Sequence, residues 1–178
     1  MSIINEKHIR KDAVMQVAHK MMLAARTAPK GRGIDNLVQA VVTDEDIKQI
    51  SNKMKELGQK HNQSFFIRDA DNILNAQALL LFGTKIKPIE LAKCGLCGYK
   101  NCEEKLKHIN VPCAFNTGDL GIAIGSAVSI AMDNRIDNRI MYTVGLAVVE
   151  LALLGDDVKI VYGIPLSVSS KNPFFDRK

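Results

Sequence analysis

The chain has 178 residues, a formal net charge of +5 and four cysteines; 47% of it is hydrophobic and 24% is charged. That length fits one domain with a buried core, and the composition excludes a mainly disordered protein. Only 5% of the residues are aromatic, and the basic residues are spread along the chain without aromatic residues between them. We therefore expect no nucleic-acid partner.

The N-terminal stretch MSIINEKHIRKD is polar and lacks the apolar core of a signal peptide. The longest apolar run, 120–132, is shorter than the roughly 20 residues that cross a bilayer. We expect a cytoplasmic protein with no membrane association. In such a reducing compartment, cysteines hold metals or do redox chemistry more often than they form disulfides.

The first part of the chain predicts helices and strands in turn. Apolar residues at helical spacing predict a helix over 8–26, and glycine and proline predict a loop over 28–33. A buried strand is expected over 36–42. The next helix has its apolar stripe within 44–57 and a following glycine that ends it, and a short strand is expected over 64–67.

The second part contains the most apolar segments. A strand is predicted over 78–82, and the segment 84–118 is rich in lysine, glycine, proline and cysteine. Two almost wholly apolar helices are expected over 119–132 and about 140–154, joined by a polar bridge. A last strand is expected over 158–163.

These elements predict an α+β fold, because the strands and helices mix without a regular βαβ order. No linker or repeat is visible, so we expect a single α+β domain over 1–178, with 84–118 as an inserted Cys-rich segment. Small residues recur every four positions in the first apolar helix, at Gly121, Gly125 and Ser129. Two apolar helices in a small protein must be buried, which predicts a homodimer; packing within one chain is the alternative.

The cysteines form the sharpest motif of the sequence, with the spacing C-x2-C-x4-C-x10-C at Cys94, Cys97, Cys102 and Cys113. Two cysteines separated by two residues can direct both thiolates at one metal centre from a tight turn. A glycine follows each of the first two cysteines and permits such a turn. The third and fourth thiolates complete a tetrahedral metal site or a cubane cluster.

Three interpretations of these cysteines compete. Disulfides are disfavoured by the reducing compartment, and a structural zinc site is compatible with the first pair. Three cysteines within nine residues and one remote cysteine favour an iron–sulfur cluster. His108, between the third and fourth cysteines, is a candidate replacement ligand in a mixed zinc site.

The segment CGLCGYKNC (94–102) resembles the C-G-x-C-G-x-x-x-C signature of 4Fe–4S domains in electron-transfer and corrinoid iron–sulfur proteins. The wider chain resembles a family of uncharacterised ferredoxin-domain-containing proteins. The stretches that carry this resemblance, besides the cysteine segment, are AARTAPKGRGID (24–35), DLGIAIGSAV (119–128), DNRIMYTVGLA (137–147) and GIPLSVSSKNPFFDR (163–177). The resemblance implies a cluster-binding domain and no known reaction.

The stretch AARTAPKGRG is also similar to the A-x-x-A-P-S-x-x-N loop of flavin-dependent nitroreductases, and the order of elements agrees. That resemblance implies a nitroreductase-like mixed sheet, two central apolar helices in a homodimer core, and FMN at the interface. Lys30 stands at the family's serine, and Gly33 lies near its asparagine. Arg10-Lys11-Asp12 replaces the paired-arginine motif that helps to hold the flavin phosphate.

The same loop carries a possible phosphate site of its own. Lys30 and Arg32 alternate with Gly31 and Gly33 just before a strand. Exposed glycine amides beside two cations can bind a phosphate, which makes Lys30, Arg32 and Gly33 candidate cofactor-binding residues. The alternative is a solvated basic loop.

The sequence thus predicts an iron–sulfur redox protein, an electron carrier or oxidoreductase with FMN as a further candidate cofactor. The alternatives are a non-enzymatic binding or assembly module with structural zinc, and a sensor that responds to cluster loss. No nucleophile elbow, P-loop or dinucleotide-binding G-x-G-x-x-G is present. No catalytic residue, substrate or redox partner is assigned.

Overall fold

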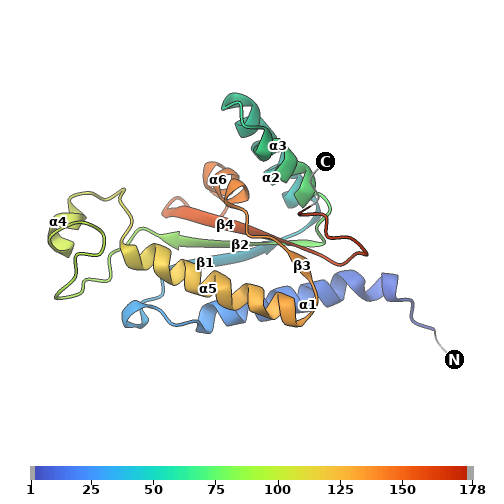
Figure 1. The fold of residues 1–178 in the computed structure, drawn as a ribbon, viewed down its shortest axis with the longest axis horizontal. Helices are drawn as coiled ribbons and strands as arrows, with labels where there is room; N and C mark the ends of the chain where they lie inside the picture. The colour runs from blue at the N-terminus through green and yellow to red at the C-terminus, as the bar shows by residue number, and fades with distance from the viewer. Residues whose placement is uncertain (1–2, 176–178) are drawn as a thin grey trace.

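The computed structural model describes residues 3–175. A four-stranded sheet with the order β1-β2-β4-β3 lies between two layers of helices (Figure 1). Its strands are β1 (Leu37–Val42), β2 (Ala78–Lys85), β3 (Asp137–Asn138) and β4 (Val158–Ser167). Every pairing between these strands is antiparallel. The resemblance to nitroreductases implied a mixed sheet, with both parallel and antiparallel strands. Within the described residues, the strands pair only in the antiparallel sense.

The antiparallel pairing of β1 and β2 follows from the two helices between them. Val42 ends β1 and pairs with Leu79 near the start of β2. Between the two strands, α2 (Asp44–Lys60) and α3 (Ser64–Ile73) pack against each other. This pair of helices returns the chain to the edge of the sheet that it left, so β2 runs back along β1.

The prediction of a short strand over 64–67 is wrong, because these residues form the first turn of α3. The buried residues of this helix are Phe66, Asp69, Ala70 and Ile73. Their spacing is that of one helical face. The predicted window of four residues was too short to show the helical spacing, which extends beyond residue 67.

The two faces of the sheet carry separate hydrophobic clusters. On one face lie α1 (Glu6–Thr27) and α5 (Ala114–Asp133), with Met21 and Ala127 fully buried. On the other face, α2 and α3 pack with α6 (Tyr142–Glu150), where Met54 and Val148 are fully buried. Figure 1 shows these two layers below and above the strands.

The two apolar helices are present as expected, with different ends. The first, α5, begins at Ala114, five residues earlier than predicted, and ends at Asp133. The second, α6, covers only Tyr142–Glu150 and is followed by a turn. Within residues 3–175, no helix combines the length and the apolar character needed to cross a membrane.

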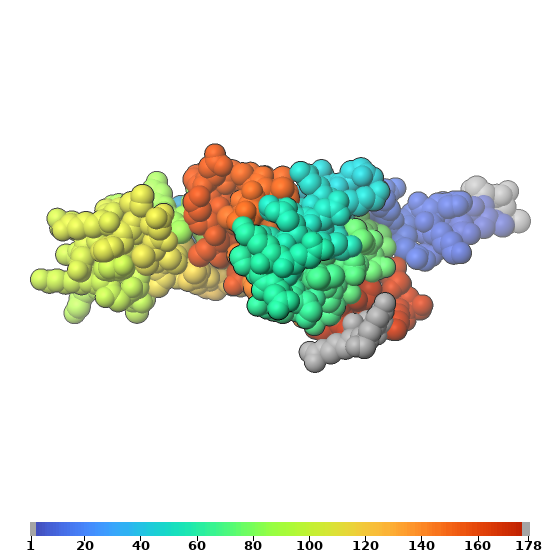
Figure 2. Space-filling model, turned by 90° about the horizontal axis from the view of Figure 1, so that it is seen from above, coloured from blue at the N-terminus to red at the C-terminus, as the bar shows by residue number. Residues whose placement is uncertain are grey.

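The cysteine-rich segment leaves the sheet after β2 and returns at α5, so it covers residues 86–113; we call it the cysteine lobe. Its only helix is the short α4 (Cys102–Leu106). The lobe projects from one end of the sheet, as both Figure 1 and Figure 2 show. The predicted loop 28–33 is also present and contains the 3-10 turn η1 (Gly31–Gly33).

Candidate metal centre and the adjoining loop

The four cysteines line one pocket in the cysteine lobe. Cys94 and Cys97 lie in irregular turns, Cys102 begins α4, and Cys113 is the residue that precedes α5. All four are free thiols; the first three are half-buried and Cys113 is buried. The residues predicted as metal ligands are thus brought to one site.

A tight turn brings the first two cysteines to the same pocket. The Gly98 amide donates to the Gly95 carbonyl over 2.9 Å. Gly98 has a φ of +86°, a conformation that glycine adopts without the steric cost that a Cβ would bring. The two glycines that follow Cys94 and Cys97 therefore form a tight turn, as their positions predicted.

Asn116 holds the two ends of the cysteine lobe together. Its Oδ1 accepts a hydrogen bond from the Cys113 amide at 3.0 Å, and its Nδ2 donates to the Lys87 carbonyl at 2.8 Å. Asn116 is 1% exposed; its bond with Cys113 is buried and its bond with Lys87 is partly buried. Sequence reasoning missed this residue, although its position three residues after a helix N-cap was a usable signal.

Most of the remaining pocket wall is apolar. It is formed chiefly by Pro88, Ile89, Leu91, Tyr99, Ala114 and Phe115. Lys105 is the one residue with a charged side chain that lines this pocket, and it is 1% exposed. His108 is exposed and stacks on Tyr99 with the ring centroids 4.9 Å apart, and it does not line the pocket.

The four cysteines line the pocket as free thiols, and no preformed metal group among residues 3–175 includes them. Nowhere in the described part of the chain do three cysteine, histidine, aspartate or glutamate side chains form a group that could hold a metal ion. A single zinc ion needs each of its sulfur ligands at about 2.3 Å.

Lys30 closes the C-terminal end of α1. Its Nζ donates to the backbone carbonyls of Ala25, Arg26 and Ala28, at 3.0, 2.6 and 2.7 Å. An ammonium group has three protons, so these three acceptors use all of them. Lysine near a helix C-terminus satisfies carbonyls that lack partners within the helix.

Arg32 connects the same loop to the cysteine lobe. Its Nη1 donates to the carbonyls of Ile89 and Glu90, at 2.7 and 2.9 Å. The Gly31 amide donates to Oδ2 of Asp119 at 3.1 Å, and the Gly33 amide to a carbonyl within the loop at 2.9 Å. The three predicted cofactor-binding residues thus lie together beside the cysteine lobe, and a phosphate there would compete with these bonds.

An ion pair fastens the base of this loop, between Arg26 at the end of α1 and Asp35 just before β1. Burial is the largest single influence and acts to raise the pKa of Asp35. The hydrogen bonds from Arg26 and the Leu37 amide and the charges of Arg26 and Lys30 together outweigh it. The pKa of Asp35 is therefore lowered, and its charged form stabilises the loop.

The arrangement of the sheet and its two helical layers is that of the nitroreductase-like flavoproteins. A nitroreductase family protein from Clostridium novyi NT matches with a TM-score of 0.62 and 16% identity, over 98% of this chain and 79% of that one. A BluB-like flavoprotein from Clostridium difficile 630 matches with a TM-score of 0.57 and 20% identity, over 88% and 81% of the two chains. At these identities the likeness shows the fold alone.

Comparison of the sequence with other proteins assigns the chain to a family. An uncharacterized protein from Archaeoglobus fulgidus is 38% identical over 182 aligned residues, which cover 98% of this chain and 97% of the relative. Residues 110–177 match a family described as uncharacterized proteins containing a ferredoxin domain. The chain belongs to this family, as the cysteine signature led us to expect. Membership of a ferredoxin-domain family, on a nitroreductase-like fold, supports a redox role in general terms.

Proposed function

We propose that the chain is an iron–sulfur redox protein in which Cys94, Cys97, Cys102 and Cys113 hold a 4Fe–4S cluster. The observation that carries the proposal is that all four cysteines line one pocket. When bound, such a cluster takes up and gives up single electrons. The protein contributes four thiolate ligands, an apolar wall that limits water access, and a turn that orients the first two cysteines.

The sequence spacing of the cysteines favours a cluster over a single zinc ion, because three of them lie within nine residues and the fourth is remote. The four cubane corners are separate metal atoms, so their ligands surround a volume, whereas zinc ligands converge on one atom. The four cysteines line a common pocket, which either group would require. The structural-zinc module remains the outcome against which the proposal is tested.

Anaerobic purification, followed by iron, sulfide and zinc analysis and a visible spectrum, tests the proposal. We expect a brown protein with iron and acid-labile sulfide in equal amounts, and an electron paramagnetic resonance signal after reduction with dithionite. Cys97→Ser should remove most of the iron. Leu96→Ser is the matched control, because Leu96 is the neighbouring residue, is 73% exposed and does not line the pocket.

The metal content decides between the alternatives. A colourless protein with stoichiometric zinc and no labile sulfide would contradict the iron–sulfur proposal and support the structural module. Iron content that is unchanged in Cys97→Ser would contradict the ligand set. The sensor alternative predicts that loss of the cluster changes the oligomeric state or a protein contact, which size-exclusion chromatography of loaded and cluster-free protein would detect.

We further propose that the redox role is flavin-linked, with Lys30, Arg32 and Gly33 as residues that would hold the FMN phosphate. Two observations support this. The fold is that of flavoproteins, and Arg32 joins the loop to Ile89, which lines the cysteine pocket. The candidate flavin loop and the candidate cluster site therefore adjoin, as electron exchange between two cofactors requires.

Comparison of FMN with riboflavin tests the role of this loop, because the two ligands differ by the phosphate alone. We expect FMN to bind more tightly than riboflavin in a fluorescence titration, and Lys30→Met to reduce that preference. Lys20→Met is the control, because Lys20 is an exposed lysine on α1, outside this loop. Equal affinity of the wild type for both ligands would contradict a phosphate site at Lys30, Arg32 and Gly33.

We also propose that the protein is a homodimer. The outer face of α5 exposes Gly118, Gly121 and Gly125, and a Cβ added at any of them would meet nothing within 4 Å. On α6, Tyr142 and Leu146 are 50% and 48% exposed. Two grooves meet at Ile160 and Tyr162 of β4, one lined by residues of α5 on one face of the sheet and the other by residues of α6 on the opposite face. A second copy packed against α5 and β4 would bury apolar surface that one chain leaves in water.

A further inference from the structure

We propose that Lys105 is the buried counter-charge of the cluster bound by the four cysteines and raises its reduction potential. The inference rests on the proposed function and assigns a role to a residue outside the ligand set. Lys105 lines the cysteine pocket and is 1% exposed. It lies three residues after Cys102 on α4, a spacing that places two side chains on the same face of a helix.

Burial separates Lys105 from the other lysines of the cysteine lobe. The segment 86–113 contains five lysines, of which the other four are exposed: Lys87, Lys93, Lys100 and Lys107. Lysine side chains are almost never fully buried unless they are paired, because transfer of a charge out of water is costly. The Nζ of Lys105 is not among the fully buried polar atoms that lack a partner in the described part of the chain, so the ammonium group keeps some contact with solvent. An anion bound in the pocket among the four thiols would pair with it.

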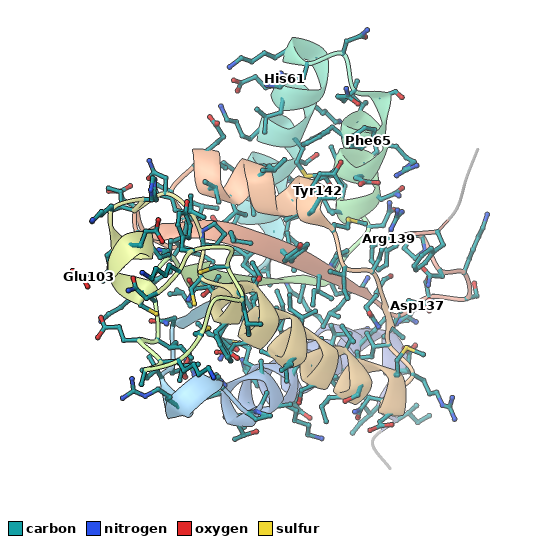
Figure 3. All side chains as sticks on the ribbon, turned by 60° about the vertical axis from the view of Figure 1, so that its left-hand side comes forward. His61, Phe65, Glu103, Asp137, Arg139 and Tyr142 are labelled. Carbon is teal, nitrogen blue, oxygen red and sulfur yellow. The ribbon has the colours of Figure 1, made fainter. Side chains whose placement is uncertain are left out.

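The described residues supply no such anion to Lys105. Its ammonium group makes no hydrogen bond or ion pair with any residue in the range 3–175, and its backbone amide bonds Asn101 within the helix. No carboxylate lines the pocket. The neighbouring acids are directed elsewhere: Glu104 accepts from the Lys100 amide at 2.8 Å, and Glu103 lies on the outer side of the lobe (Figure 3).

The proposed cluster would supply the missing charge. Four iron atoms in the common oxidised state, four sulfides and four thiolates together carry two negative charges, and uptake of one electron makes three. A nearby cation stabilises the more negative, reduced state more strongly, particularly where water is excluded. The electron comes from a low-potential one-electron donor, dithionite in the test, and no bond or proton changes at Lys105.

Redox titration of Lys105→Met, followed by the visible spectrum, tests this role. Methionine has a similar length and no charge, so it removes the charge while filling much of the same volume. At a fixed potential we expect the ratio of reduced to oxidised cluster to fall about tenfold, which for a one-electron couple is a shift of about 59 mV to more negative values. Lys105→Arg should restore most of the shift. Lys107→Met is the matched control, because Lys107 is exposed two residues further on, and its potential should stay near that of the wild type.

Each outcome bears on the proposal. A potential that is unchanged in Lys105→Met, with wild-type iron content, would overturn the role of Lys105 and leave the cluster proposal intact. Loss of the cluster in Lys105→Met but not in Lys105→Arg would support a charge requirement, and loss in both would show a packing role and overturn the proposal. Wild-type protein that contains zinc and no iron would contradict the proposed iron–sulfur function itself. Metal analysis of the wild type would show this before any variant is made.

Discussion

Nη1 of Arg32 lies 2.7 Å from the backbone carbonyl oxygen of Ile89, so a side chain of the loop after α1 fixes the start of the cysteine lobe. Arg32 has a φ of 56°, a left-handed conformation that is uncommon outside glycine. The lobe carries four cysteines on one short helix and irregular chain. Its polar links to the rest of the fold include Arg32 and Asn116, and Asn36 adds a longer hydrogen bond to the Lys87 carbonyl. We therefore expect the ordered conformation of the cysteine lobe to depend on these few hydrogen bonds.

We predict that Arg32→Ala loosens the cysteine lobe. The variant loses two charge-assisted hydrogen bonds to carbonyls, at a cost of about 1–2 kcal/mol. Hydrogen exchange should accelerate in the lobe and stay unchanged in β2 and β4. Arg135→Ala is the control, since Arg135 has a similar φ of 57° and an exposed side chain. If hydrogen exchange in the cysteine lobe were equally fast in the two variants, the contact between Arg32 and Ile89 would not be what keeps the lobe ordered.

We predict that Asn116→Ala lowers the iron content without unfolding the protein. The change leaves the Cys113 amide and the Lys87 carbonyl without their buried partner, at a cost of about 1–3 kcal/mol. The fourth ligand would then be poorly positioned, so cluster loss on air exposure should be faster. Thr117→Ala is the control, because Thr117 is exposed and its hydroxyl donates only to a carbonyl within its own helix turn. Wild-type iron retention in Asn116→Ala would contradict the positioning role.

The grouping of the cysteines could be predicted because the motif is local. All four lie within 94–113, and the turn that brings the first two to the same pocket is closed by a bond between two nearby glycines. Asn116 carried a weaker local signal, its position three residues after Cys113, and Lys105 carried none. The importance of each depends on its burial, and burial is set by elements far away in the sequence.

The loop 28–33 shows a different limit of sequence reasoning. Its composition indicated a phosphate site, but composition does not reveal which acceptors are already within reach. The carbonyls at the end of α1 point toward Lys30, and Ile89 reaches Arg32 only because the cysteine lobe folds back onto the loop. Tertiary contacts of this kind determine how much of a basic loop remains available to a ligand, and the phosphate site stays a prediction.

We predict that Gly145→Ala strongly destabilises the fold. Gly145 lies in α6 where that helix crosses β4, and a Cβ there would lie only 1.6 Å from the Val161 carbonyl oxygen. The helix would have to move away from the sheet, at a cost of about 3 kcal/mol or more. Gly118→Ala is the control, because Gly118 lies in α5 and a Cβ there meets nothing within 4 Å. Alanine at that position should raise the free energy of unfolding by up to about 1 kcal/mol, because it has a higher helix propensity than glycine. Urea unfolding of both variants measures the difference, and equal midpoints would contradict the close approach of α6 to β4.

We predict a pH-dependent effect for Asp35→Asn. The folded protein lowers the pKa of Asp35 below its ordinary value of 3.8, so the ion pair with Arg26 stabilises the fold above that value. The contribution disappears as the pH falls through the lower, folded-state pKa. At pH 7 the variant should be less stable by about 0.5 kcal/mol, because the pair is partly exposed. Urea unfolding should show the difference shrinking below about pH 4, and a constant difference from pH 7 to pH 2 would contradict the ion-pair contribution.

We predict that Gly125→Lys converts a dimer into a monomer. Gly125 is exposed in the middle of α5 and has open space around it, so lysine fits within one chain. At the proposed interface, however, the new side chain would force the two copies apart and bury a charge. Light scattering after size-exclusion chromatography should give about twice the 19.6 kDa chain mass for the wild type and the single mass for the variant. Asn52→Lys is the control, because it adds the same charge at an exposed position of α2 on the other side of the sheet. A monomeric wild type, or a dimer that survives Gly125→Lys unchanged, would show that the face formed by α5 is not the interface.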